Sequence, residues 1–341
     1  MSKSSEEFNI ENEVPDISPR VLLTYARLWQ FETWLRRMVY VELRARDGDD
    51  WSDDIEGVDG ARNADNRLTH MPTPETDPLS YMLFSKLLGL IGDTNNWEMF
   101  THYLPPKKIW EAKIEELTQI RNRVAHFRKG HIDDLQRLKQ LLRDIDKGFW
   151  IFCTSFNDTY PVLPQDRDPV TLEFLELDPF SYTQFPDGVW GRVGSAPPEM
   201  KFMVTIEILK RPWANPAPQV DGSQGYLYDA TISARQERCF DYRKLLEDTK
   251  GVHSHLVYLC LDKFAHSVRI TIPAILGSAR VIELIQQFIK VTEYTISRNI
   301  QISESDDSVQ RLSDKWPEFI LGPENPLTFL GPGMPCPFFG A

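Results

Sequence analysis

The spacing of apolar residues changes near Phe156, and this change constrains the fold more than any other feature of the chain. Before it, apolar side chains recur every three or four residues, as on one face of an α-helix. After it, prolines stand at positions 161, 164, 169, 179 and 186, too often for a long helix. Short runs of β-branched and aromatic residues follow. The sequence therefore predicts an α+β protein, with an all-α helical bundle followed by a smaller mixed α+β domain.

The first part of the chain carries the signals of four or five helices. Ser18 can cap the first helix, Pro19 suits its first turn, and Gly48 is a natural stop. The polar segment that follows, up to Pro74, is rich in carboxylates and is expected to be a solvated acidic loop. Further helices are expected at 77–91, within 93–103, from 105 with an interruption at Gly130, and from 132 to about 152.

The second part predicts strands and one long helix. Strands are expected at 202–209, 226–233, 256–261 and 267–272, and a helix at 278–297. The expected organisation is a disordered acidic N-terminus (1–16), the helical bundle (17–157), the α+β domain (165–320) and a Pro/Gly-rich tail (321–341). Because the tail carries several Leu and Phe residues, we expect it to pack on its own protein or on a partner.

Composition excludes several classes of protein. The net charge of −12 argues against non-specific coating of nucleic acid. No apolar run approaches the roughly 20 residues of a membrane span, and the N-terminus lacks a signal-peptide pattern, so we expect a cytoplasmic protein without a membrane partner. The four cysteines match no zinc or disulfide spacing, and the acidic segment lacks the ligand spacing of a calcium loop. No metal or other cofactor is expected.

One region has the opposite charge. Residues 117–143 carry seven Lys and Arg residues but only two acidic residues. A basic site on an acidic protein is typical of an enzyme that selects its anionic substrate.

The segment LTQIRNRVAHFRKGH, residues 117–131, holds the candidate chemistry. Asn122 and His126 are four residues apart, so a helix would present them on one face. Arg121 and Arg128 would follow each other on the adjoining face. The opposite side has apolar residues available for burial: Ile120, Val124 and Phe127.

These groups suit the cleavage of RNA without a metal ion. An imidazole transfers protons near neutral pH, and a guanidinium matches phosphate oxygens and keeps its charge. An amide can hold the imidazole or a phosphate oxygen in place. A single His is too few for a separate acid and base, which suggests that two chains build one site.

The string Arg121-Asn122-x-x-x-His126, late in a helical bundle, resembles the motif of the HEPN superfamily: an Arg, a polar residue and a later His. The aromatic-rich segment Leu28–Arg36 resembles the opening of Abi-like HEPN domains, and the stretch from Trp97 to Leu117 resembles the approach to their motif. The resemblance covers the helical bundle alone. Some HEPN toxins carry a Tyr two residues after the His, as a target for nucleotidylation, where this chain has Arg128.

The resemblance implies a metal-independent endoribonuclease in which two motif-bearing helices meet in a homodimer. Its substrate would be RNA, such as tRNA, cleaved through 2′-OH attack to a 2′,3′-cyclic phosphate. His126 would be the general acid/base, Arg121 the phosphate stabiliser and Asn122 the positioner. Arg128, Arg36 and Arg37 are further candidates for binding substrate phosphates. The resemblance implies a toxin or an anti-phage defence effector. The second domain would bind a regulatory protein or a small-molecule trigger.

Other interpretations of the same residues remain open. The Arg–Asn–His trio could make ordinary structural hydrogen bonds, or the domain could be a non-catalytic HEPN adaptor that binds a nucleotide or a partner protein. The chain could also be the effector of a larger assembly and inert alone. Elsewhere, Gly191–Gly194 is too short for a phosphate-binding loop, and His253 and His255, which alternate as in a strand, lack further metal ligands.

Overall fold

The computed structural model describes residues 18–53, 55, 58–68, 70, 77–157, 168–298, 307–335 and 337–340. Its contacts divide the chain into two compact units, each described by itself. The helical unit comprises Met1–Arg37, Leu83–Trp150 and Cys336–Ala341, and the sheet unit comprises Met38–Met82 and Ile151–Pro335. The protein is therefore of mixed α+β class, as predicted, but the sheet unit is the larger of the two units and not the smaller one. Among the described helices, none is long and apolar enough to cross a membrane.

This division differs from a single boundary near residue 157. Two long helices, α2 (Pro19–Asp47) and α8 (Asp134–Phe156), contribute residues to both units. The last turns of α2 group with the sheet because their polar side chains bond there. The Tyr40 hydroxyl donates to the carbonyl of Val257 at 3.0 Å, and the Arg44 guanidinium donates to that of Leu256 at 3.2 Å. Periodicity predicts the helix but not which unit each of its turns joins.

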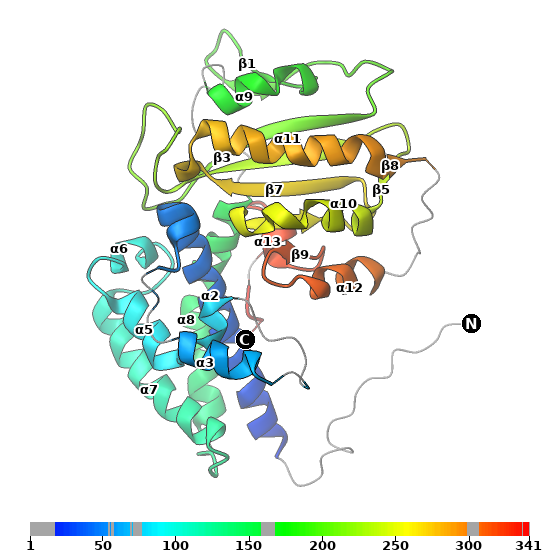
Figure 1. Ribbon diagram of the computed structural model, residues 1–341. Coiled ribbons are helices and arrows are strands. Elements are labelled where there is room, and N and C mark those ends of the chain that lie inside the picture. The colour runs from blue at the N-terminus through cyan, green and yellow to red at the C-terminus, as the bar shows by residue number, and fades with distance from the viewer. Residues whose placement is uncertain are drawn as a thin grey trace. The chain divides into compact units, whose positions relative to one another are not determined.

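The helical unit contains α5 (Phe84–Gly92), α6 (Trp97–Phe100) and α7 (Lys107–Ala125), together with the first part of α2 and most of α8 (Figure 1). Aromatic rings anchor its core. The centroid of the Phe31 ring lies 6.5 Å from that of Phe84 and 6.4 Å from that of Trp110. Gly148 on α8 permits a close backbone approach, because a Cβ there would lie 1.7 Å from the carbonyl oxygen of Tyr103. No other residue type fits that position.

Several predicted helix bounds are confirmed and others are wrong. Helix α2 has the bounds that its start and stop signals predicted. The single helix expected from Asp77 to Ile91 is instead two, α4 (Pro78–Tyr81) and α5, because Met82 and Leu83 have extended backbone with ψ of 128° and 144°. The segment expected to be a loop contains the 3₁₀ helix η1 (Gly48–Asp50) and the helix α3 (Asp59–Asn66). Helix α3 buries none of its side chains.

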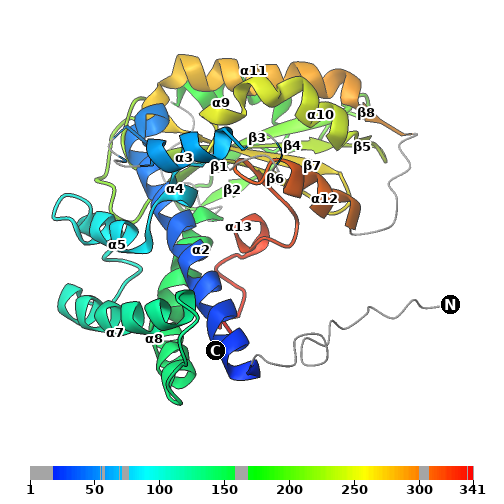
Figure 2. The ribbon, with the colours of Figure 1, turned by 60° about the horizontal axis from the view of Figure 1, so that its bottom comes forward.

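The sheet unit is built on one five-stranded sheet of order β3-β4-β7-β6-β9. Neighbouring strands are antiparallel except β9, which runs parallel to β6. Helices α11 and α10 lie side by side over one face of the sheet (Figures 1 and 2). The strands are β3 (Phe202–Lys210), β4 (Tyr226–Ala234), β6 (Tyr258–Leu261), β7 (Ser267–Pro273) and β9 (Ile320–Leu321), and the helices are α10 (Tyr242–Thr249) and α11 (Ser278–Thr295).

Shorter elements complete the sheet unit. Two further two-stranded ribbons pair β1 (Tyr182–Gln184) with β2 (Trp190–Arg192), and β5 (Cys239–Phe240) with β8 (Ile296–Ser297). The remaining helices are α9 (Pro169–Glu173), η3 (Leu175–Leu177), η4 (Lys250–His255), η5 (Ala274–Leu276), α12 (Asp307–Lys315) and α13 (Pro326–Phe329).

The four predicted strands and the predicted long helix of this unit are confirmed to within a few residues. The two histidines expected to alternate in a strand, His253 and His255, lie instead in the 3₁₀ helix η4. His253 is buried, with its Nε2 3.0 Å from the Thr249 hydroxyl, whereas His255 lies 2.5 Å from the Asp49 carboxylate. They face different partners and do not form one site.

A buried ion pair lies in the core of the sheet unit. Glu42 on α2 and Arg211, just after β3, are both fully buried. The Arg211 Nη2 donates to Glu42 at 2.6 Å, its Nε donates at 3.1 Å, and the Trp213 indole N–H donates to the same carboxylate at 2.6 Å. Charges removed from water in this way are tolerated only when they are paired and hydrogen-bonded. This pair ties the end of α2 to the sheet.

The apolar tail packs on its own protein, as predicted. In the helical unit Phe339 is 2% exposed, and the rings of Phe338 and Phe339 lie 5.9 and 5.0 Å from that of Phe149. The backbone N–H groups of both residues donate to the Asp146 carboxylate at 2.7 Å. The side chain of Leu327 is fully buried in the sheet unit.

Candidate active site

Helix α7 carries most of the predicted motif and ends within it. The helix stops at Ala125, and the Arg128 N–H donates to the Arg123 carbonyl at 2.9 Å while the Phe127 N–H donates to that of Val124 at 3.1 Å. This pair of bonds is the Schellman motif, which satisfies carbonyls left without partners at a helix end. Its left-handed position is Phe127, with φ of 52°. The expected interruption at Gly130 was therefore wrong by several residues.

His126 occupies the C-cap position, with φ of −100° and ψ of 17°. Its backbone N–H still donates to the Asn122 carbonyl at 3.2 Å, so these two residues keep their helical spacing. The imidazole is exposed, whereas Asn122 is half-buried. The structure thus leaves His126 at the surface, one turn after Asn122.

Phe127 does not bury the opposite side of the helix, as the sequence had led us to expect. Its side chain is 98% exposed. The left-handed backbone turns the chain away from the helix, so a residue three positions after Val124 no longer shares its face. Ile120 is buried as expected, and Val124 is half-buried. Ile132, which was expected to belong to the next amphipathic helix, is 68% exposed because α8 begins only at Asp134.

The two motif arginines differ in their surroundings. The Arg121 guanidinium is half-buried and lies 5.9 Å from the centroid of the Phe84 ring, a cation–π contact that holds it against the bundle. Arg128 is exposed and lies beyond the helix, so helical spacing does not relate it to Arg121. Both charges remain accessible, one on a packed side chain and one on the turn.

Asp134 locks the connection between α7 and α8. Its carboxylate accepts two hydrogen bonds from the Arg123 guanidinium, one of them at 3.0 Å, and one from the backbone N–H of His131 at 2.8 Å. Burial alone would raise the pKa of this carboxyl, but the bonds from Arg123 and His131 hold it below its usual value. The hydrogen bond from Arg123 to Asp134 also raises the pKa of that guanidinium. The turn carrying His126 is therefore fixed at both ends.

A surface hollow of about 500 Å³ lies beside this turn. A second ion pair, between Arg137 and Glu116, joins α8 to α7 at its rim. The side chains that line the hollow include Ile120, Arg123, Lys129, His131, Asp134 and Arg137. Three cationic side chains line it beside two carboxylates, those of Glu116 and Asp134.

Arg36 and Arg37 are engaged on their own helix. Arg36 forms an ion pair with Glu32, one turn earlier. The Arg37 guanidinium lies 5.0 Å from the centroid of the Trp34 ring. Both side chains are half-buried. Both candidates thus have partners on α2 itself.

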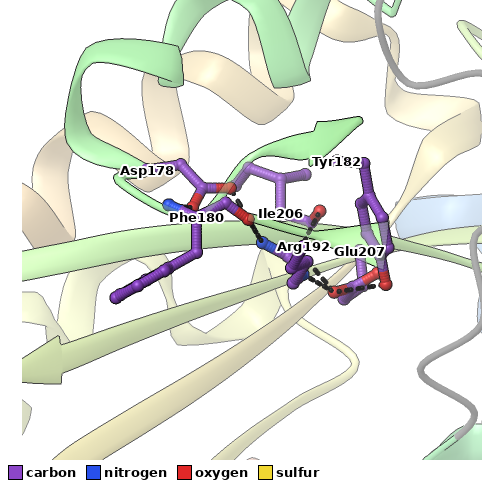
Figure 3. A network of polar contacts seen from close by, with 6 residues as sticks. All are labelled: Asp178, Phe180, Tyr182, Arg192, Ile206 and Glu207. Carbon is purple, nitrogen blue, oxygen red and sulfur yellow. Dashed lines mark hydrogen bonds and ion pairs between the residues drawn. The ribbon is translucent and has the colours of Figure 1, made fainter. Parts of the chain in front are cut away.

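The sheet unit contains a second dense polar cluster, centred on Arg192 (Figure 3). Its guanidinium donates to Asp178 at 2.9 Å and to Glu207 at 3.1 Å, and its carbon Cζ lies 4.3 Å from the centroid of the Tyr182 ring. Burial lowers the pKa of Arg192, but the carboxylate of Glu207 more than offsets this and raises it. Two carboxylates and a ring surround the guanidinium, so the cluster braces the β1–β2 ribbon against β3. The Arg192 side chain is 22% exposed, but both carboxylates already pair with its charge.

The side chains of the described residues that could bind a metal ion are not grouped together. Across residues 18–298 and 307–340, apart from the gaps noted above, no group of three His, Cys, Asp or Glu side chains is arranged to hold a metal ion. The described acidic residues before Pro74 include Asp49, whose partners are Arg44 and His255.

Comparisons with known proteins add no relative. No family model matches the chain, and neither the curated proteins nor the solved structures include a significant match. The candidate site therefore stands on its own residues.

Sequence reasoning missed the part that Asp134 plays and misplaced Phe127. A signal for Asp134 was present, since an acidic residue at the start of an amphipathic helix often bonds back to the preceding turn. No comparable signal existed for Phe127, because Gly is the residue that normally marks a left-handed helix end.

Proposed function

We propose that this chain is a metal-independent endoribonuclease of the HEPN type, with Arg121, Asn122 and His126 as its catalytic residues. The observation that carries the proposal is the end of α7. There an exposed imidazole lies one turn after Asn122, and the guanidinium of Arg121 is held against the bundle while remaining partly open to solvent. A proton-transfer group, an amide and a fixed cation thus stand at one accessible helix end.

The chemistry that we propose uses these groups on the RNA itself. A base removes the proton of the 2′-OH, and the resulting oxygen attacks the adjacent phosphorus. The bond from phosphorus to the 5′-oxygen breaks, and that oxygen takes up a proton. The products are a 2′,3′-cyclic phosphate and a 5′-hydroxyl. His126 transfers protons, Arg121 stabilises the negative charge that builds up on the phosphorane, and Asn122 positions the reacting groups.

A second imidazole is needed for separate acid and base steps. We propose that it comes from a second copy of the chain, in a homodimer formed through the motif-bearing helix. Arg128 lies next to the site and would contact substrate phosphates, whereas Arg36 and Arg37 contribute to the fold of α2. The proposal extends to a toxin or anti-phage defence effector acting on cytoplasmic RNA such as tRNA, with a regulatory protein or small molecule bound at the sheet unit.

The test is cleavage of labelled tRNA and mixed cellular RNA in the presence of EDTA. Wild type is expected to cut, and both Arg121→Ala and His126→Ala to lose at least about 100-fold in rate. Matched controls are the exposed residues Arg143 and His102, whose alanine variants should cut as wild type does. Equal loss in the controls, or cutting that survives both motif variants, would end the assignment.

The dimer has a separate test. Because the proposed site needs an imidazole from each chain, a mixed dimer of wild type and His126→Ala should not cut, so an excess of His126→Ala protein should suppress the activity of a fixed amount of wild type. Wild-type activity that is unchanged by the excess of His126→Ala protein would show that each chain cuts without an imidazole from a partner.

A further inference from the structure

Phe127 is unusual in both backbone and exposure. It occupies the left-handed position of the helix end, with φ of 52°, which Gly normally takes because it has no Cβ. Its side chain is 98% exposed, so no packing within the unit accounts for an aromatic residue there. Strained backbone that brings a large ring into solvent beside a candidate catalytic His is a reason to look for a function.

The residues around Phe127 carry positive charge. Arg128 and Lys129 follow it directly, and both are exposed. Arg128 and the ring lie on a turn whose ends are fixed by the Schellman bonds and by Asp134. Proteins that bind single-stranded nucleic acid combine basic side chains along the backbone with aromatic rings on which the bases stack. The turn contains both elements within three consecutive residues.

The hollow beside the turn completes this arrangement. Two of its cations already have carboxylate partners, since Arg123 pairs with Asp134 and Arg137 pairs with Glu116. Lys129 lines the same hollow, and the described residues supply it with no ion pair. Phe127 and Lys129 are two positions apart, and so short a segment spans at most about 7 Å. One nucleotide can therefore contact both side chains.

We propose that the connection between α7 and α8 is a binding subsite for single-stranded RNA. Phe127 stacks against a base, and Lys129, at the hollow, contacts the neighbouring phosphate. The inference rests on the proposed function, since it places that nucleotide beside His126. A nuclease with this subsite should prefer unpaired RNA, because a base held in a duplex cannot stack on a side chain.

A second copy of the chain is the other occupant that an exposed Phe suggests. An apolar contact between proteins needs a continuous apolar patch, and any large apolar side chain can serve in it. The chain neighbours of Phe127 are His126 and Arg128, and the nearest large exposed apolar residue along the chain is Ile132. Polar and charged neighbours favour a base over a protein surface.

The experiment measures binding of a fluorescent single-stranded 2′-O-methyl RNA, which cannot be cleaved by 2′-OH attack, by fluorescence polarisation. Phe127→Ala and Phe127→Leu should weaken binding about 5- to 100-fold, and Phe127→Trp should retain it, because stacking needs a ring. Lys129→Gln should bind more weakly and should lower the salt dependence by roughly the contribution of one phosphate contact. Phe264→Ala and Lys147→Gln, at exposed positions elsewhere, are matched controls and should bind as wild type does.

The outcomes separate the inference from the function on which it rests. Wild-type affinity in Phe127→Ala would overturn the subsite, and if His126→Ala still abolished cleavage the nuclease would stand without it. Binding that depends on Phe127 in a protein that never cleaves RNA would instead leave the subsite and remove the nuclease. A third outcome is that Phe127→Leu binds RNA as wild type does and that Phe127→Ala sediments as a monomer. That outcome would assign Phe127 to an interface between copies.

Discussion

Two arginines of the sheet unit are held by carboxylates, whereas two arginines of the helical unit remain open to solvent. In the sheet unit, Arg211 is fully buried against Glu42, and Arg192 is surrounded by two carboxylates and a tyrosine ring. In the helical unit, Arg128 is exposed on the turn after α7, and Arg121 is partly open to solvent. The composition of the chain gives no hint of this difference, since all are arginines in an acidic protein.

This difference between paired and open arginines indicates where a ligand can bind. A guanidinium whose hydrogen bonds are satisfied by carboxylates holds the chain together and has little left for a substrate. A guanidinium or ammonium group at a fixed but open turn keeps its charge available. We therefore locate the candidate chemistry in the helical unit and regard the ion pairs of the sheet unit as structural.

The largest effect on stability is expected at the buried pair. Arg211→Met should lower the free energy of unfolding by about 3–5 kcal/mol, because it leaves the carboxylate of Glu42 buried without its partner. Adding Glu42→Gln should recover part of that loss, since a neutral amide still accepts a hydrogen bond from Trp213. Urea unfolding of the single and double variants measures both effects. The exposed Arg143→Gln is the control, and an Arg211→Met protein as stable as that control would show that the pair is not structural.

A pH effect is expected at His253 in the sheet unit. Burial lowers the pKa of His253 to about 4, whereas an unfolded His titrates near 6.5. Between these values the unfolded state binds a proton that the folded state does not, so stability should fall as pH drops from about 6.5 to 4, by up to about 3 kcal/mol. His253→Gln should flatten this dependence in unfolding measured across the range. The half-buried His255 offers a control, since His255→Gln should leave this part of the dependence in place.

A smaller loss is expected at the turn of the helical unit. Asp134→Asn should cost about 1–3 kcal/mol at neutral pH, because it removes a charge-assisted bond to Arg123. The folded pKa of Asp134 is depressed, so its contribution is present above the unfolded value near 3.9 and disappears as pH falls through the folded value. Wild type and variant should therefore converge in acid. A constant difference down to pH 2 would contradict this account.

The smallest change in stability, and the only increase, is expected at Phe127. Phe127→Gly should stabilise the helical unit by about 1 kcal/mol, because Gly adopts the left-handed backbone without strain. The same variant should bind single-stranded RNA more weakly. Thermal unfolding of Phe127→Gly beside Phe127→Ala isolates the backbone term, since Ala removes the ring but keeps a Cβ. A Gly variant less stable than the Ala variant would show that the left-handed conformation is not strained.

The sequence predicted regular elements better than their ends and partners. Strands β3, β4, β6 and β7 follow runs of β-branched and aromatic residues, helix α11 follows an apolar stripe, and helix α2 follows its start and stop signals. The end of α7 could not be read because Phe127 stands where Gly is expected. The ion pair of Glu42 with Arg211 joins residues 169 positions apart, and no local pattern encodes such a distance.

The candidate site was predicted in its chemistry but not in its geometry. Arg121, Asn122 and His126 were chosen by residue type and spacing, and they lie at one helix end. The exposure of His126 and its place outside the last helical turn depend on hydrogen bonds beyond the motif. Their catalytic role remains a prediction.

The most direct measurement is the chemistry of the RNA ends produced in EDTA by wild-type protein and by His126→Ala. The account predicts a 2′,3′-cyclic phosphate and a 5′-hydroxyl from wild type, and no product above background from the variant. Ends carrying a 5′-phosphate, or the same products from His126→Ala, would contradict it.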